Sequence, residues 1–278
     1  MIRAGLIAAV LALWSGAGNA GCLQDAAPCA IDSGTYHIER PAGIDPQIRL
    51  PAVMFLHGWG ASGQATMSNR GMVDILLARG YAVIAPDGRL RDTGQGRTWD
   101  FHPARATTAL RDEASFVAAV ADDAAARHGI DRDLVILGGF SIGGSTASYI
   151  ACKTPDAFAA FAPVAGSFWN PLPTRCAGPV RLLHVHGWTD TTVPLEGRRL
   201  SSGITQGDVF ASMAVWRQTN GCTQPRPDGF DRTPDFQVRR WTSCAPGSAL
   251  GFALHTGAHG IPKGWATLML DWFAQLQP

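Results

Sequence analysis

Short apolar runs that alternate with longer amphipathic stretches constrain the fold of this chain most strongly. The runs lie at 53–56, 82–85, 134–137 and 180–185. Strands that are apolar on both faces are typical of a parallel sheet covered by helices, because water reaches neither face. Residues 106–128 carry apolar side chains at helical spacing, and residues 265–276 predict a closing helix. The pattern predicts one α/β domain, with a mostly parallel central sheet and helices on both faces.

The first twenty residues predict an export signal that is not part of the fold. Arg3 precedes an apolar run at 6–14, and small residues follow up to Ala20. The run is about half the roughly 20 residues that a membrane-spanning helix needs. We therefore expect cleavage after Ala20 and a secreted or periplasmic domain of residues 21–278, with no membrane attachment after cleavage. Lipoprotein processing at Cys22 stays open as an alternative.

The charge balance excludes several classes of partner. Lys and Arg number 23 and Asp and Glu number 22, which gives a net charge of +1. A chain so close to neutral offers no basic surface to nucleic acid or to anionic lipid. The sequence contains no CxxC motif and no Cys/His cluster with zinc spacing. We therefore expect neither a metal nor another cofactor.

Six cysteines, an even number, agree with export to an oxidising compartment. The simplest pairing joins nearest neighbours along the chain. Its last two bridges would each close a loop of about 25 residues and stabilise the fold by about 3 kcal/mol in the chain-entropy model. The alternative is that one or two cysteines remain buried free thiols. The nearest-neighbour pairs are Cys22–Cys29, Cys152–Cys176 and Cys222–Cys244.

A GxSxG motif lies between the third apolar run and a helical stretch. It consists of Gly139-Phe140-Ser141-Ile142-Gly143. At such a sharp turn from strand to helix, the serine takes a strained backbone conformation and its Oγ is exposed above the sheet. Ser141 is therefore the candidate nucleophile. The backbone N–H of Ile142, at the start of the helix, is a candidate donor to a developing oxyanion.

A serine nucleophile needs a general base that a carboxylate orients, and after a motif of this kind the acid precedes the base in the chain. Asp190 lies just beyond the fourth apolar run and is the candidate acid. Glu196 and Asp208 are its competitors, farther from the strand. His259 lies in a loop of small residues before the last helix and is the candidate base. Its rival, His255, lies within a strand-like run.

Tryptophans lie in several of the loops that carry these motifs. Glycines flank Trp59 after the first apolar run, so we assign the second oxyanion donor to its backbone N–H and expect the His57 side chain to brace this loop. Trp188 lies next to the acid, and Trp99 lies in a loop after the second run. Because indole rings offer a large rigid surface, Trp59, Trp188 and Trp99 are candidate substrate-binding residues; the alternative is a packing role. Four other tryptophans are expected in the core: Trp216, Trp241, Trp265 and Trp272.

Taken together, the motifs resemble the secreted polyhydroxybutyrate depolymerase and feruloyl esterase-like family of α/β-hydrolases. The resemblance implies an α/β-hydrolase fold with Ser141 as nucleophile, Asp190 as acid and His259 as base. It also implies that Cys152 pairs with Cys176 and that Cys222 pairs with Cys244. The loop at 260–264 departs from the family's pattern and borders the acyl site, which leaves the substrate open. The resemblance spans most of the mature chain, including 34–36, 56–59, 139–144, 155–166, 184–194 and 257–259.

The expected function is a secreted serine carboxylic-ester hydrolase that forms an acyl-enzyme intermediate. Its expected partner is an ester, either a small aryl or acyl ester or a polyester, and we expect a monomer. An acyltransferase or a peptidase would use the same triad, and the fold also serves non-catalytic binding modules. The complete set of Ser141, Asp190 and His259 favours an enzyme, because a binding module has little reason to keep it.

Overall fold

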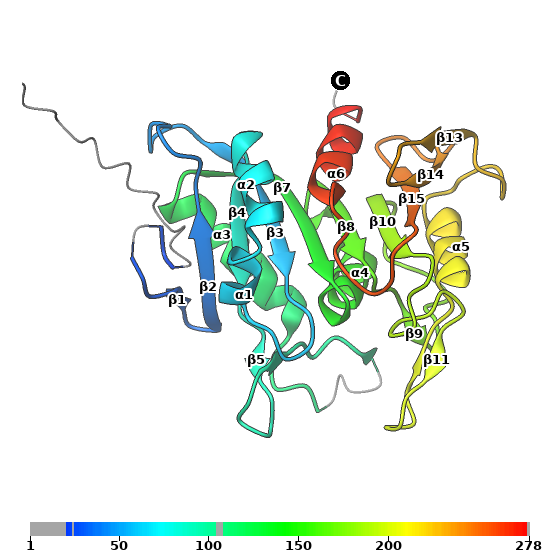
Figure 1. The fold of residues 1–278 in the computed structure, drawn as a ribbon, viewed down its shortest axis with the longest axis horizontal. Helices are drawn as coiled ribbons and strands as arrows, with labels where there is room; N and C mark the ends of the chain where they lie inside the picture. Colours follow the sequence, from blue (N-terminus) through cyan, green and yellow to red (C-terminus); the bar gives the residue numbers. More distant parts are fainter. Residues whose placement is uncertain (1–20, 24, 104–107, 277–278) are drawn as a thin grey trace, which may run out of the picture.

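The computed structural model describes residues 21–23, 25–103 and 108–276. Figure 1 shows a central sheet with helices on both sides. The expected export signal at 1–20 lies outside the described residues. None of the described helices combines the length and the apolar character that crossing a membrane requires.

A ten-stranded sheet runs through the molecule in the order β1-β2-β4-β3-β7-β8-β10-β15-β14-β13. Its six central strands are parallel to one another, and the strands outside them at each edge are antiparallel. This confirms the predicted α/β class with a mostly parallel central sheet. The central strands are β4 (Ala82–Pro86), β3 (Leu50–Leu56), β7 (Ile130–Phe140), β8 (Ala160–Val164), β10 (Arg181–Gly187) and β15 (Ala249–His255). The edge strands are β1 (Cys29–Ile31), β2 (Gly34–Glu39), β14 (Gln237–Trp241) and β13 (Gly229–Arg232).

Helices cover the two faces of the sheet in two groups, and each group encloses its own apolar core. Side chains of β3 alternate between the cores: Met54 belongs to one and Phe55 to the other. The first group is α3 (Glu113–Arg127), α4 (Ile142–Lys153) and α5 (Val209–Thr219). The second group is α1 (Gly63–Met67), α2 (Arg70–Ala78) and α6 (Trp265–Ala274). A short 3₁₀ turn, η2 (Pro155–Ala157), follows α4.

Two small sheets lie beyond the carboxyl ends of the central strands. One is the hairpin of β5 (Arg89–Leu90) and β6 (Arg97–Thr98). The other joins β9 (Trp169–Asn170), β12 (Thr205–Gln206) and β11 (Arg198–Arg199). Figure 1 shows β5, β9 and β11 together at the lower edge, where the arrow of β3 ends. Ligands bind at this edge in open α/β sheets.

One predicted helix begins later than expected. The periodic stretch from 106 suggested a long helix, but α3 begins at Glu113. The Asp112 carboxylate accepts a hydrogen bond of 2.8 Å from the Ser115 backbone N–H, which caps the helix at this point. Residues 108–112 are not helical, and residues 104–107 lie outside the described part of the chain.

Three disulfides cross-link the fold, and no described cysteine is free. They are the nearest-neighbour pairs, so the alternative of buried free thiols is not what the structure shows. The second bridge fastens the carboxyl end of α4 to the segment before β10. The pairs are Cys22–Cys29, Cys152–Cys176 and Cys222–Cys244.

Replacing Cys152 and Cys176 together by alanine is expected to lower the free energy of unfolding by about 3 kcal/mol, because the unfolded chain regains the entropy of a large open loop. The bridge spans 24 residues along the sequence, whereas Cys22–Cys29 spans 7. Urea unfolding of the oxidised protein and of both double variants measures the loss. A change within experimental error for Cys152/Cys176, or a larger loss for the short bridge, would contradict this prediction.

Candidate active site

The turn from β7 into α4 places Ser141 at the carboxyl edge of the sheet. Its backbone has φ 58° and ψ −121°, a conformation that residues other than glycine rarely adopt. Two glycines make the turn possible. A Cβ atom on Gly139 would lie 2.4 Å from the Gly143 carbonyl oxygen, and one on Gly143 would lie 2.3 Å from the Leu56 carbonyl oxygen. This close approach holds Ser141 at the junction of strand and helix, the geometry expected for an exposed nucleophile.

Ser141, His259 and Asp190 form one chain of hydrogen bonds. His259 Nε2 lies 2.9 Å from Ser141 Oγ, and His259 Nδ1 lies 2.7 Å from Asp190 Oδ2. The three residues follow β7, β10 and β15, three strands that end at the same edge. Because a carboxylate can only accept, Nδ1 carries the proton and Nε2 is left to accept the proton of the serine hydroxyl.

The Asp190 carboxylate is buried and held by its own loop. Its side chain has 0% exposure, and its Oδ1 accepts hydrogen bonds of 2.8 Å from the backbone N–H groups of Thr192 and Val193. Its Oδ2 accepts from His259. Both oxygens of a buried charge are therefore satisfied, as such a group requires.

The competing residues are engaged elsewhere. His255 ends β15, and its Nδ1 accepts a hydrogen bond of 3.1 Å from the Gly257 N–H. Asp208 caps α5 by accepting from the Ala211 N–H. Glu196 is exposed. Ser141 therefore contacts His259, and not His255, through a hydrogen bond.

The His57 side chain braces the loop after β3. Its Nδ1–H donates to the Gly58 carbonyl oxygen at 2.8 Å, and its Nε2 accepts from the Gly88 N–H at 3.0 Å. The Trp99 indole N–H donates to the His57 carbonyl oxygen at 2.9 Å. Burial lowers the pKa of His57 to about 4, so the ring stays neutral at neutral pH.

Of the two expected oxyanion donors, Trp59 lies in the loop after β3 and Ile142 directly follows Ser141. In a trans peptide the carbonyl and the N–H point in opposite directions, so the Trp59 N–H points away from the His57 ring that holds the Gly58 carbonyl. The Ile142 N–H is in the first turn of α4, where no intrahelical acceptor exists. Within the described part of the chain, neither amide donates a backbone hydrogen bond. Their oxyanion role stays a prediction.

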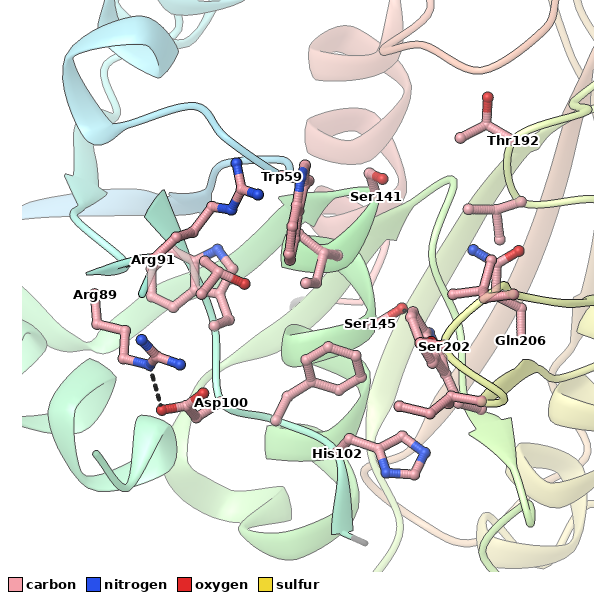
Figure 2. Close-up of a pocket in the computed structure, with 18 of the residues that line it drawn as sticks. Trp59, Arg89, Arg91, Asp100, His102, Ser141, Ser145, Thr192, Ser202 and Gln206 are labelled. Atoms are coloured by element: carbon pink, nitrogen blue, oxygen red, sulfur yellow. Dashed lines mark hydrogen bonds and ion pairs between the residues drawn. The ribbon is translucent and has the colours of Figure 1, made fainter. Parts of the chain in front are cut away.

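A cavity of about 560 Å³ opens beside Ser141. Figure 2 shows its residues converging from the small sheets and from α4. The Ser145 hydroxyl, one helical turn after the nucleophile, accepts a hydrogen bond of 3.1 Å from the Trp169 indole N–H. An ion pair of 2.7 Å joins Arg89 and Asp100 at one side. The aromatic lining consists of Trp59, Trp99, Phe101, His102 and Trp169.

The predicted substrate-binding tryptophans differ in their positions. Trp59 lines the cavity and is 59% exposed, with the Arg91 guanidinium 4.4 Å from its ring centre. Trp99 also lines the cavity but is almost fully buried. Trp188 is 63% exposed and lies outside this cavity, and its part in substrate binding stays a prediction. It follows β10 directly, and its backbone N–H is bonded to the His255 carbonyl.

Sequence reasoning missed Trp169. This residue begins β9, shortly after β8, and β8 was itself missed. The signal that could have found it is the short apolar run at 160–164, which predicts a loop at the same edge of the sheet. The four tryptophans expected in the core are buried: Trp216, Trp241, Trp265 and Trp272.

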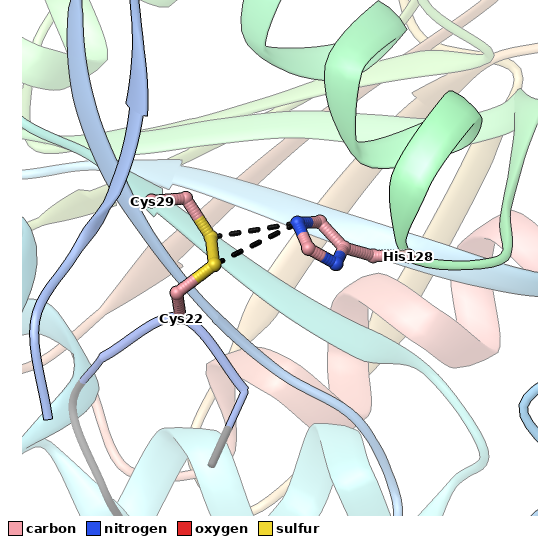
Figure 3. Close-up of side chains that lie close together, drawn as sticks. All are labelled: Cys22, Cys29 and His128. Atoms are coloured by element: carbon pink, nitrogen blue, oxygen red, sulfur yellow. Dashed lines mark hydrogen bonds between the residues drawn. A yellow bond between two sulfur atoms is a disulfide. The ribbon is translucent and has the colours of Figure 1, made fainter. Parts of the chain in front are cut away.

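One group of possible metal ligands converges within the described residues: Cys22, Cys29 and His128. Figure 3 shows the two sulfurs joined in a disulfide that faces the imidazole. His128 Nε2 lies 3.5 Å from Cys29 Sγ and 3.8 Å from Cys22 Sγ. Zinc is bound by thiolates, and a disulfide offers none. This cluster is therefore a packing contact between the N-terminal segment and the end of α3.

Acid is expected to destabilise the protein through its buried histidines. Burial lowers the pKa values of His57, His128, His184, His186 and His255, whereas in the unfolded chain each binds a proton below about pH 6.5. Their stabilising contribution is therefore complete above that pH and is lost as the pH falls toward the folded values.

The substitution His57→Gln tests the contribution of one of these histidines. With a folded pKa of about 4, His57 accounts for a loss of about 2 to 3 kcal/mol in unfolding free energy between pH 7 and 4.5. Denaturant unfolding at both pH values is expected to show a smaller loss in the variant. Equal losses in the variant and the wild type would contradict the prediction.

Two curated relatives are named as esterases. The chain is 32% identical over 152 residues to the putative esterase NocK of Nocardia uniformis subsp. tsuyamanensis, covering 53% of this chain and 42% of that protein. It is 25% identical over 239 residues to feruloyl esterase B of Piromyces equi, covering 82% of this chain and 42% of that protein. The chain thus spans less than half of the length of either relative.

A solved structure and a family model agree on the fold. The acetyl xylan esterase from Aspergillus awamori aligns with a TM-score of 0.63 at 18% identity, covering 86% of this chain and 93% of the other. The model of the alpha/beta hydrolase fold family matches residues 51–204, more than half of the sequence. The chain therefore belongs to the α/β-hydrolase fold family.

Proposed function

We propose that the protein is a serine carboxylic-ester hydrolase, with Ser141 as nucleophile, His259 as general base and Asp190 as the orienting acid. The observation that carries the proposal is the unbroken chain of hydrogen bonds from Ser141 Oγ to the buried Asp190 carboxylate. The esterase names of the relatives support an ester as the bond that is cleaved.

The geometry supports a two-step reaction through an acyl-enzyme. Ser141 Oγ attacks the ester carbonyl carbon while His259 Nε2 takes its proton, and the buried Asp190 carboxylate stabilises the imidazolium that forms. His259 then returns the proton to the alcohol oxygen as the C–O bond breaks. Water attacks the acyl-enzyme by the same route, which releases the acid and restores Ser141.

The proposed oxyanion hole consists of the backbone N–H groups of Trp59 and Ile142. The tetrahedral intermediate carries a negative charge on the former carbonyl oxygen, and fixed amide donors stabilise it without reorganising. The braced Gly58 carbonyl and the helix start after Ser141 support this assignment.

The size and lining of the cavity support a bulky substrate group. Cavities of about 300 to 1,000 Å³ are typical of sites for drug-sized ligands, and the 560 Å³ beside Ser141 exceed what an acetyl group fills. Aromatic side chains on its walls favour a planar aromatic group, because such rings pack edge to face or offset on one another. We propose an ester of an aromatic acid, of the feruloyl type, as the substrate class and place a polyester segment second.

Three disulfides support a proposed extracellular or periplasmic location for a mature domain of residues 21–278. Disulfides persist in oxidising compartments and are rare in a reducing cytosol. Mass spectrometry of the exported protein tests the proposed cleavage after Ala20.

Ser141→Ala is expected to lower kcat for p-nitrophenyl butyrate by about 10⁶-fold, as in other serine hydrolases that lose the nucleophile. His259→Ala is expected to be nearly as damaging. His255→Ala is the matched control and is expected to keep most activity, because His255 does not contact Ser141. Circular dichroism checks that each variant is folded. Wild-type turnover by a folded Ser141→Ala variant would end the serine-hydrolase proposal.

Trp169→Ala is expected to raise KM for methyl ferulate about fivefold, since an aromatic contact contributes roughly 1 kcal/mol. Hydrolysis of methyl butyrate is the comparison, because this ester has the same alcohol group and carries no aromatic ring. Trp188→Ala is the matched control, since Trp188 lies outside the cavity. Equal effects of the two substitutions on methyl ferulate would show that the cavity does not hold the aromatic group.

A further inference from the structure

Two buried histidines lie beneath the proposed acid, on the same face of β10. His184 is 1% exposed and His186 is 0% exposed. Their rings stack with centroids 5.3 Å apart and planes 8° apart. Leu182, two residues earlier on this face, is part of an apolar core, as is Phe252, which packs against His184. An apolar pair would fill this space without the cost of burying polar rings, so the imidazoles call for a specific explanation.

The hydrogen bonds of His186 determine where its proton lies. Nε2 lies 2.8 Å from the Val193 carbonyl oxygen, which can only accept, so Nε2 carries the proton. Nδ1 of the neutral ring is then an acceptor, and His184 Nε2–H donates to it at 3.0 Å. The donors point in one direction, from His184 through His186 to the loop after β10. Both nitrogens of His186 are therefore satisfied.

The protonated nitrogen of His186 also lies near the proposed acid. His186 Nε2 lies 3.5 Å from Asp190 Oδ2, the oxygen that accepts from His259. The carbonyl that His186 holds belongs to Val193, whose own N–H donates to Asp190 Oδ1. His186 thus holds the loop whose Val193 N–H donates to Asp190 Oδ1, and its own Nε2 lies near Asp190 Oδ2.

We propose that His186 is a positioning residue, which holds the 190–193 loop and the Asp190 carboxylate in the orientation that His259 requires. His184 donates to Nδ1 of His186 and so keeps the proton of the His186 ring on Nε2. His186 does not line the cavity, so its effect falls on the reaction step more than on substrate binding. The inference rests on the proposed triad, because it concerns how that triad is held.

Three substitutions of His186 separate positioning from packing. His186→Leu keeps the volume and removes both nitrogens. His186→Gln carries an amide N–H at a reach similar to that of Nε2. His186→Asn is shorter: its amide replaces Nδ1 and cannot reach the Val193 carbonyl. His128→Leu is the matched control, since it also removes a buried imidazole, whose ring contacts the disulfide Cys22–Cys29 and the Tyr36 ring and none of the triad residues.

Steady-state hydrolysis of p-nitrophenyl butyrate is the first readout. His186→Leu and His186→Asn are expected to lower kcat about 10²-fold, the scale expected when a catalytic group is misplaced by about 1 Å. KM is expected to change less than about threefold. His186→Gln is expected to recover most of kcat, and His128→Leu to lose stability but keep kcat. If His186→Leu does not fold, the comparison of kcat between His186→Gln and His186→Asn still tests the positioning role. Equal kcat for the Gln and Asn variants would overturn the proposal.

The second readout does not depend on activity. The downfield proton resonance of His259 Nδ1–H reports its hydrogen bond to Asp190, and it is expected to shift or broaden in His186→Leu and to remain in His128→Leu. An unchanged resonance in His186→Leu would overturn the role of His186. Failure of the proposed function is distinguishable, because the wild type itself would then not hydrolyse the ester.

Discussion

The close approach of β7, α4 and the end of β3 determines where the chemistry can occur. Because residues 139 and 143 are glycines, backbone carbonyl oxygens can lie within 2.4 Å of the positions that Cβ atoms would occupy there. The turn leaves Ser141 with a positive φ of 58°, a strain that the surrounding sheet and helix must offset. From this point the Ser141 hydroxyl faces the loops after β10 and β15, and the start of α4 lies beside the cavity.

Neutral buried histidines hold the loops on two sides of that turn in the same way. His57 donates to the Gly58 carbonyl and accepts from a backbone N–H. His186 donates to the Val193 carbonyl and accepts from His184. Each ring uses one nitrogen as donor and the other as acceptor, which only the neutral form can do. The two loops therefore keep their positions only while both imidazole rings are neutral. Protonation of these rings at acid pH is expected to destabilise the fold and to disturb the active site at the same time.

The sequence predicted the parts of the molecule that local chemistry determines. Four apolar runs became β3, β4, β7 and β10, and a GxSxG motif between a strand and a helix located the turn at Ser141. Strand β8 was missed because Pro163 argues against a central strand. The start of α3 was misplaced because the cap at Asp112 interrupts the apolar period. The role of His186 depends on contacts with Val193, His184 and Asp190 in the folded chain, and no local sequence pattern shows it.

Covalent labelling tests the central claim most directly. Diethyl p-nitrophenyl phosphate transfers its phosphoryl group to an activated serine and releases p-nitrophenolate. One group per chain is predicted, on the peptide that contains Ser141, with ester hydrolysis lost in proportion to labelling. A label on another residue, or full ester hydrolysis by protein that is labelled at Ser141, would contradict the account.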